Sequence, residues 1–180
     1  MAWADLAALL GPGEVSYVPG VTAVPADWTV VQAIPGVEMV GDSVRAETDP
    51  EAERLGLADA DEMLDLVARA QPGPFRRKTV SLGAYYGIRR HGKLVAMAGE
   101  RVRRPGWTEI SAVCTDPAHR GQGVAGRLVR TVAAHIVGER GDTPFLQAAA
   151  ANEGAIRLYE SLGFSLRRPT QFTAVSAPAH

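Results

Sequence analysis

The sequence predicts an α/β protein in which helices and strands are interspersed through most of the chain. Two segments, 124–136 and 152–162, carry apolar residues at the spacing of one helical face. Three strand-like segments, 85–90, 94–102 and 107–115, are separated only by the short turns His91-Gly92 and Pro105-Gly106. Such short connections are typical of antiparallel neighbours.

Composition restricts the class of protein. The chain has 180 residues with 46% hydrophobic and 22% charged residues, which is ordinary for one globular domain with additional elements. A net charge of −1 argues against a general nucleic-acid-binding surface. Cys114 is the only cysteine, so no intrachain disulfide or cysteine metal cluster can form. Because we find no signal peptide and no apolar run long enough for a bilayer, we expect no membrane partner and a cytoplasmic location.

The first part of the chain reads as an extension of the main domain. A short helix over 4–10 is followed by three short strands, at 15–18, 28–34 and 37–40, and then by a polar connection. We expect residues 1–54 to form a small β-rich N-terminal extension that packs on the main sheet or extends it.

The main domain is predicted over 55–175, and 176–180 are expected to be a disordered tail. The expected elements, in order, are helices at 59–71 and 75–82, the three antiparallel strands, a helix at 124–140, a strand at 144–150, a helix at 152–162, and strands at 164–166 and 171–175.

A glycine-rich loop joins the third strand to the long helix. Gly121, Gly123 and Gly126 leave its backbone accessible, and the free N–H groups at the start of a helix favour an anion such as phosphate. Arg120 adds a full positive charge. The same glycines match a dinucleotide-binding fingerprint, but the loop does not follow its strand directly and the next strand lacks the acidic residue. A glycine turn without a ligand is the other alternative.

Two motifs resemble one family. Arg120, Gly123 and Ala125 fit the Arg/Gln-x-x-Gly-x-Gly/Ala segment with which GNAT-superfamily N-acetyltransferases bind acyl-CoA. The segment from Asn152 to Phe164 is very similar to the family's Asn-x-x-Ala-x-x-x-Tyr-x-x-x-Gly-Phe motif. Both motifs and the element order agree from about residue 55 to 175. The resemblance implies a GNAT fold: a mixed, mostly antiparallel sheet with a splayed parallel strand pair and helices on both faces.

The resemblance also implies how acetyl-CoA, the expected co-substrate, is held. Its pantetheine arm would pair with the backbone of the third strand, and the Val113 N–H would hold the oxyanion. Its pyrophosphate would lie on the loop N–H groups. The implied coenzyme-binding residues are Val113, Thr115, Arg120, Gly121, Gln122, Gly123, Val124, Ala125, Gly126, Asn152 and Tyr159.

Direct transfer to an amine needs a base and an acid. Glu109 is the first candidate base because strict alternation gives it the parity of Val113 and Thr115, although a bulge would shift that parity. Its alternative role is a structural ion pair, and Glu100 is the second candidate. Tyr159 matches the family's tyrosine that donates to the leaving sulfur; its alternative role is core packing.

We expect a primary amine as acceptor, in a small molecule, peptide or protein, and the sequence does not identify it. Four scattered histidines predict no metal site. The chain is expected to be a monomer or a homodimer and to bind no nucleic acid. Two other functions stay open at this point: a non-catalytic acyl-CoA sensor, and an acyltransferase that uses a longer acyl-CoA.

Overall fold

A computed structural model describes residues 2–21 and 23–179 of the chain. Its strands form one eight-stranded sheet in the order β1-β8-β2-β7-β6-β5-β4-β3, and of its neighbouring pairs only β6 and β7 are parallel. The predicted mixed, mostly antiparallel sheet with a parallel pair is therefore confirmed. The strands are β1 (Val15–Pro19), β2 (Thr29–Val40), β3 (Glu53–Leu55), β4 (Tyr85–Arg90), β5 (Lys93–Arg104), β6 (Trp107–Thr115), β7 (Thr143–Ala149) and β8 (Ser165–Ser176).

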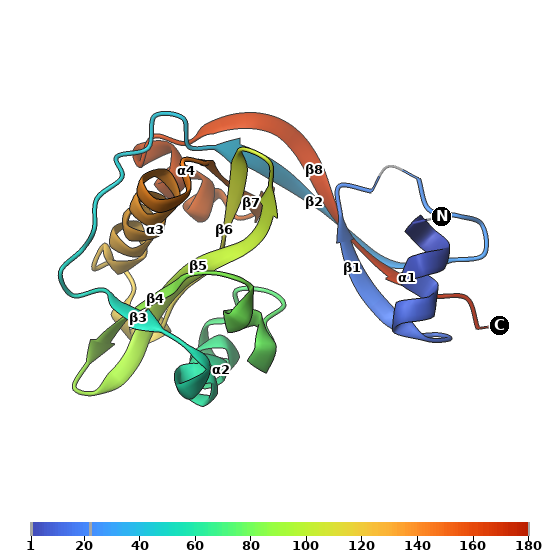
Figure 1. The fold of residues 1–180 in the computed structure, drawn as a ribbon, viewed down its shortest axis with the longest axis horizontal. Helices are drawn as coiled ribbons and strands as arrows, with labels where there is room; N and C mark the ends of the chain where they lie inside the picture. Colours follow the sequence, from blue (N-terminus) through green and yellow to red (C-terminus); the bar gives the residue numbers. More distant parts are fainter. Residues whose placement is uncertain (1, 22, 180) are drawn as a thin grey trace.

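Helices cover both faces of the sheet (Figure 1). The α-helices are α1 (Ala2–Leu10), α2 (Ala60–Ala70), α3 (Val124–His135) and α4 (Glu153–Ser161). Shorter turns are the 3₁₀ segments η1 (Leu57–Asp59), η2 (Arg77–Leu82) and η3 (Pro117–His119), and a π-turn, η4 (Ile136–Arg140), continues α3. The second predicted helix, at 75–82, is thus only a 3₁₀ segment.

Each face has its own apolar core. On one face, Leu128 and Val132 of α3 pack with Ile110 and Leu146 of the sheet. On the other, Met63 of α2 belongs to a cluster with Tyr85 and Met97. All these side chains are at most 2% exposed. Complete burial of one such side chain contributes about 1.5–3 kcal/mol, which fixes α3 and α2 on opposite faces.

The N-terminal segment supplies an interior strand of the sheet. β2 lies between β7 and β8 and runs without a break through Pro35, where two separate strands were predicted. Likewise, β8 is one strand through Pro169 rather than two. A proline removes one N–H donor but keeps its carbonyl, and the Pro35 carbonyl accepts from the Ala150 N–H at 2.9 Å. Strand pairing on both sides of β2 therefore outweighs this local interruption.

The far ends of β2 and β8 form a ribbon that projects from the main body and carries β1 and α1 (Figure 1). There Trp3 of α1 packs edge to face on Trp28, with ring centroids 4.9 Å apart, beside the buried Val175. The segment after 175 differs from the predicted disordered tail: Ser176 ends β8, and Ala177 is buried and donates its N–H to Glu14. His180 lies outside the described residues.

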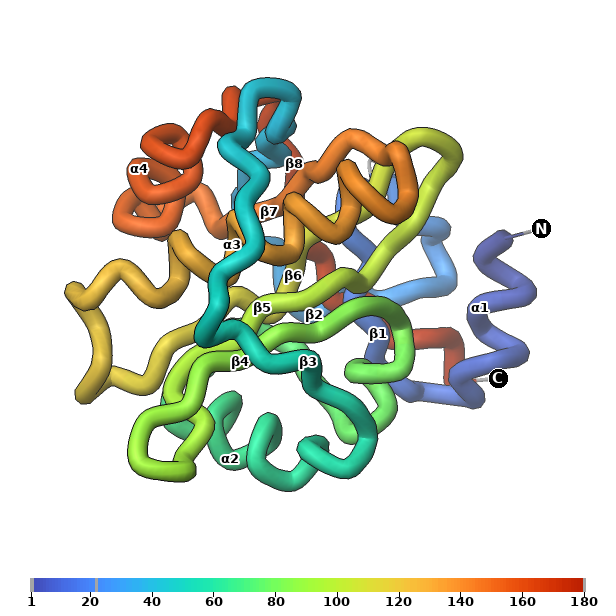
Figure 2. The backbone as a smooth tube through the Cα atoms, turned by 60° about the vertical axis from the view of Figure 1, so that its left-hand side comes forward, coloured from blue at the N-terminus to red at the C-terminus, as the bar shows by residue number. Residues whose placement is uncertain are grey.

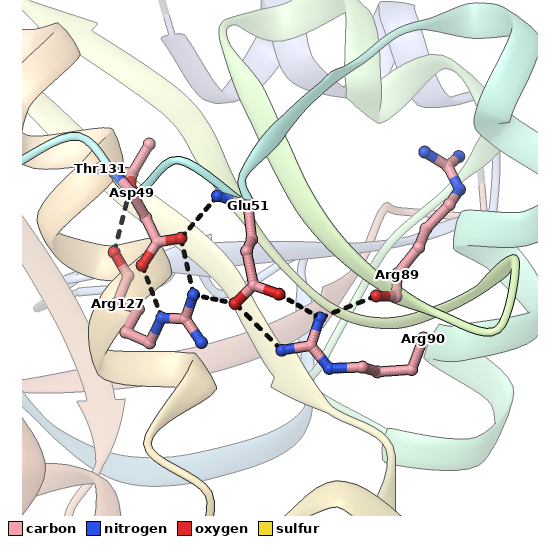
Figure 3. A network of polar contacts seen from close by, with 6 residues as sticks. All are labelled: Asp49, Glu51, Arg89, Arg90, Arg127 and Thr131. Atoms are coloured by element: carbon pink, nitrogen blue, oxygen red, sulfur yellow. Dashed lines mark hydrogen bonds and ion pairs between the residues drawn. The ribbon is translucent and has the colours of Figure 1, made fainter.

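The polar connection between β2 and β3 crosses α3 (Figure 2). Arg127 of α3 donates to Asp49 at 2.7 Å and also contacts Glu51, which pairs with Arg90 of β4 at 2.8 Å. The Thr131 hydroxyl accepts from the Asp49 N–H at 3.0 Å (Figure 3). This network ties the connection to α3 and β4 and fixes the helix whose first turn borders the predicted site.

Candidate active site

The glycine-rich loop lies at the start of α3, as predicted. Gly121 and Gly123 have positive φ values of 76° and 73°, and Gly123 is the residue that caps the helix. Arg120, Gly121, Gln122 and Gly123 are all exposed. The loop therefore leaves the unpaired N–H groups of the first helical turn open to a ligand.

The later residues of this motif have a packing role. Val124 is 3% exposed and its side chain belongs to the core, so only its backbone could contact a ligand. Ala125 is partly buried. Gly126 is buried where α3 packs against Leu158 of α4 and the following Leu162, and a Cβ there would lie at an ordinary contact distance of 3.5 Å from both.

The parallel pair of strands separates beside this loop. β6 pairs with β7 only from Trp107 to Ile110, opposite Thr143 to Leu146. Beyond Leu146, β7 pairs with β2 alone, so the β7-facing edge of residues 111–115 has no strand partner in the described chain. Val113 and Thr115 lie on this edge, and the Thr115 hydroxyl is buried without a hydrogen-bond partner. The structure thus places an unpaired backbone edge and an unused polar atom next to the helix start.

A bulge in β6 reverses the alternation of its side chains. Ala112 has a φ of 52°, and the register with β5 shifts between Ser111 and Cys114. As a result, Val113 packs with the core under α3, while Cys114 packs with the core under α2. The prediction that Glu109 shares the parity of Val113 and Thr115 is therefore wrong, because the bulge adds one residue between them.

Glu109 lies on the face covered by α2. Its side chain is 3% exposed and forms a two-bond ion pair, accepting from Arg101 Nε at 3.0 Å and Nη2 at 2.7 Å. Glu100, the second candidate, lies on the other face and is fully buried. Burial alone would raise the pKa of Glu100, but the Arg140 guanidinium and the Ala84 N–H hold it below its ordinary value. Both oxygens of Glu100 are engaged, and so are both oxygens of Glu109, through Arg101. The two carboxylates differ in the face of the sheet on which they lie, and Glu109 is the one on the face opposite α3 and the glycine loop.

Tyr159 lies on α4 with its ring 6.1 Å from that of Phe164, and it is 7% exposed. Burial, followed by the nearby Cys114, raises the pKa of Tyr159 to about 12. Its hydroxyl has no hydrogen-bond partner among the described residues. A protonated, unpartnered phenol is chemically suited to donate to a ligand.

Two other predicted residues have clear local roles. The Asn152 side chain accepts from the Ala155 N–H at 3.2 Å and caps α4, and Asn152 itself is exposed. Burial raises the pKa of the Cys114 thiol to about 12, so it is protonated at neutral pH and unsuited to nucleophilic attack.

The sequence analysis missed a second polar group on the face that Glu109 occupies. Glu38 of β2 is 1% exposed and binds Arg168 at 2.9 Å and Arg167 at 2.8 Å, and Gln147 of β7 donates to it at 3.3 Å. Hydrogen bonding from Arg168 is the main cause that lowers the Glu38 pKa. No motif marks this group, because its acid and its arginines lie about 130 residues apart and meet only through sheet pairing.

No group of three potential metal ligands is found in residues 2–21 and 23–179. Among the helices of the same residues, none has the length and apolar character needed to cross a membrane.

Comparison with known proteins agrees with this geometry. The family described as FR47-like protein matches residues 85–173. N-alpha-acetyltransferase RimI of Mycobacterium tuberculosis is 32% identical over 133 residues, which cover 66% of this chain and 81% of that protein. The chain belongs to the GNAT superfamily of N-acetyltransferases, as the sequence motifs predicted.

Solved structures give the same fold. A GNAT-family acetyltransferase from Novosphingobium aromaticivorans is 40% identical, with a TM-score of 0.87 over 97% of this chain and 79% of that chain. The ribosomal-protein-S18-alanine N-acetyltransferase of Escherichia coli shares the fold at 21% identity, with a TM-score of 0.58 over 72% of this chain and 94% of that chain.

Proposed function

We propose that this protein transfers the acetyl group of acetyl-CoA directly to the α-amino group of a peptide or protein. The observation that carries this proposal is the unpaired edge of β6, which lies beside an open glycine loop at the start of α3. The acceptor class is supported by the Mycobacterium tuberculosis relative, which is named an N-alpha-acetyltransferase.

The residues present fit the coenzyme. Its pyrophosphate would bind the N–H groups of residues 121–126, with Arg120 nearby. Its pantetheine arm would pair with the backbone of Val113 and Thr115, where the unpartnered Thr115 hydroxyl offers a further polar contact. Asn152, exposed at the start of α4, would contact the same arm.

The chemistry then follows from three groups. The amine nitrogen attacks the thioester carbon, and the Val113 N–H stabilises the oxyanion that forms. Glu109, directly or through a water molecule, receives the proton that the amine loses. The carbon–sulfur bond breaks, and the Tyr159 hydroxyl donates a proton to the departing sulfur. No covalent enzyme intermediate is needed, because Cys114 is a protonated thiol at neutral pH.

The test is release of free CoA from acetyl-CoA by the purified protein, measured with a panel of peptides, amino acids and small amines. Mass spectrometry of the products should show acetyl on the α-amino group of a peptide. Propionyl-CoA and longer esters, assayed in parallel, test the use of another acyl group. Coenzyme binding by calorimetry without turnover of any amine would instead identify a non-catalytic acyl-CoA sensor and refute the proposal.

A further inference from the structure

Three side chains of β6 form a row on the face of the sheet that carries α2. Trp107, Glu109 and Ser111 alternate along the strand before the bulge, so they share this face. Ser111 is paired with Gly99 and, through it, with Tyr85, whose ring belongs to the core under α2. The row therefore lies opposite α3 and the glycine loop, on the side from which an acceptor would reach the bulge.

Two cavities lie along this row, one at each end. The first, a small hollow of about 30 Å³, is at the bulge and is lined by Pro72, Gly73, Pro74, Arg101, Ser111 and Ala112. The second, of about 130 Å³, is at the start of β6 and is lined by Glu38, Arg104, Trp107, Phe145 and Arg167. Glu109 lies between the two cavities, since it is paired with Phe145 across the parallel strands.

The spacing of the cavities suits an extended peptide. Ser111 and Trp107 are four residues apart on one strand, which corresponds to about 13 Å. A peptide in extended conformation covers the same distance in about four residues. A single amino acid or a small amine placed at the first cavity would not reach the second.

The second cavity carries an excess of positive charge. The only carboxylate that lines it, Glu38, is shared by Arg167 and Arg168. Arg104 is exposed and has no ion pair among the described residues. The Arg167 guanidinium lies 5.1 Å from the centre of the Trp107 ring, so its remaining donors are held at the cavity wall. With two arginines against one carboxylate in its lining, the cavity complements a negatively charged group.

We propose that the second cavity selects an acidic side chain about four residues from the reacting amine of an extended peptide acceptor. This inference rests on the proposed function for the place of the reacting amine. Arg104 would form the ion pair, and Trp107 would pack against the peptide. Glu38 acts as a positioning residue that holds Arg167 and Arg168 in place.

The test uses seven-residue peptides with an N-terminal alanine in which one aspartate is moved from position two to position six in an asparagine background. We expect KM to be about twofold to fivefold lower for the peptide with aspartate near position four than for the all-asparagine peptide, with little change in kcat. This advantage should shrink at 0.5 M salt. In the Arg104→Gln variant the two peptides should become equivalent. The same substitution at Arg157, which is exposed on α4 and pairs with Glu153 there, should keep the preference.

A binding measurement separates this inference from the proposed function. Trp107 fluorescence, with a Trp107→Phe variant to subtract the signal of Trp3 and Trp28, reports peptide binding without any turnover. Tighter binding of the aspartate peptide would support the charged cavity even if no peptide were acetylated. Equal binding and equal KM for all peptides, or acetylation of alanine amide as efficient as that of the best peptide, would overturn the cavity while leaving the acetyltransferase proposal intact.

Discussion

Removal of one oxygen atom, in Tyr159→Phe, tests the acid role of this tyrosine. The Tyr159 pKa of about 12 means that at pH 8 about one molecule in 10⁴ is ionised, so the phenol is ready to donate. General acid catalysis contributes at least about a hundredfold when the donor is well placed. We therefore expect kcat to fall about a hundredfold or more, equivalent to at least about 2.7 kcal/mol of barrier.

The fold and the coenzyme site should survive this substitution. The phenylalanine ring keeps its packing on Phe164, and the lost hydroxyl has no protein partner among the described residues. Calorimetry should give an acetyl-CoA dissociation constant within about twofold of wild type, and thiol release gives kcat. The control is Tyr86→Phe, which removes a hydroxyl that accepts from Arg54 on the outer strands, and its kcat should be unchanged. An unchanged kcat in Tyr159→Phe would refute the acid role.

Three further changes test other parts of the structure. Glu109→Gln should lower kcat about tenfold or more and alter the acidic limb of the pH profile; an unaltered profile would leave Glu109 a structural partner of Arg101. Gly123→Ala should lower the free energy of unfolding by about 1 kcal/mol and weaken coenzyme binding, because φ is 73° although space for a methyl is open. Gly138→Ala, where φ is not positive and space is also open, is its control, and equal effects would contradict the argument. Glu38→Gln should cost about 1–3 kcal/mol at pH 7, measured by denaturant unfolding. Because Arg168 lowers the Glu38 pKa below its ordinary value of 4.5, this stabilisation is present above pH 4.5 and should disappear as the pH falls below it; a pH-independent difference would refute it.

The parts of the fold that the sequence predicted are those governed by local chemistry. Glycines at the start of α3, the asparagine that caps α4 and the apolar faces of both helices act over a few residues, and the structure contains them where they were expected. The continuous strands β2 and β8 were not predicted, because Pro35 and Pro169 are local signals for a break. Only pairing with distant strands overrides them, and this pairing leaves no periodic signature in a single sequence.

In the candidate site, too, the local features were predictable from the sequence and the features that depend on the sheet were not. The loop from Arg120 to Gly126 follows from its residue types. The face on which Glu109 lies did not follow, since one bulged residue, Ala112, inverts the parity of everything beyond it. The group around Glu38 was invisible for a related reason: its members lie at opposite ends of the chain.

The interior position of β2 has a consequence for biosynthesis. Thr29 pairs with Ser176, and Val40 pairs with Ser165. The ribosome therefore makes β2 long before it makes β8, the strand that contains both partners. The segment in between can fold around α3 first, while Trp28, which is buried with Val175 in the folded protein, is still exposed. Contacts between residues so distant along the chain slow folding, and they prolong the time during which the unpaired edge of β2 can pair with another chain. Nascent chains stalled before residue 165 should therefore be the species most prone to aggregate.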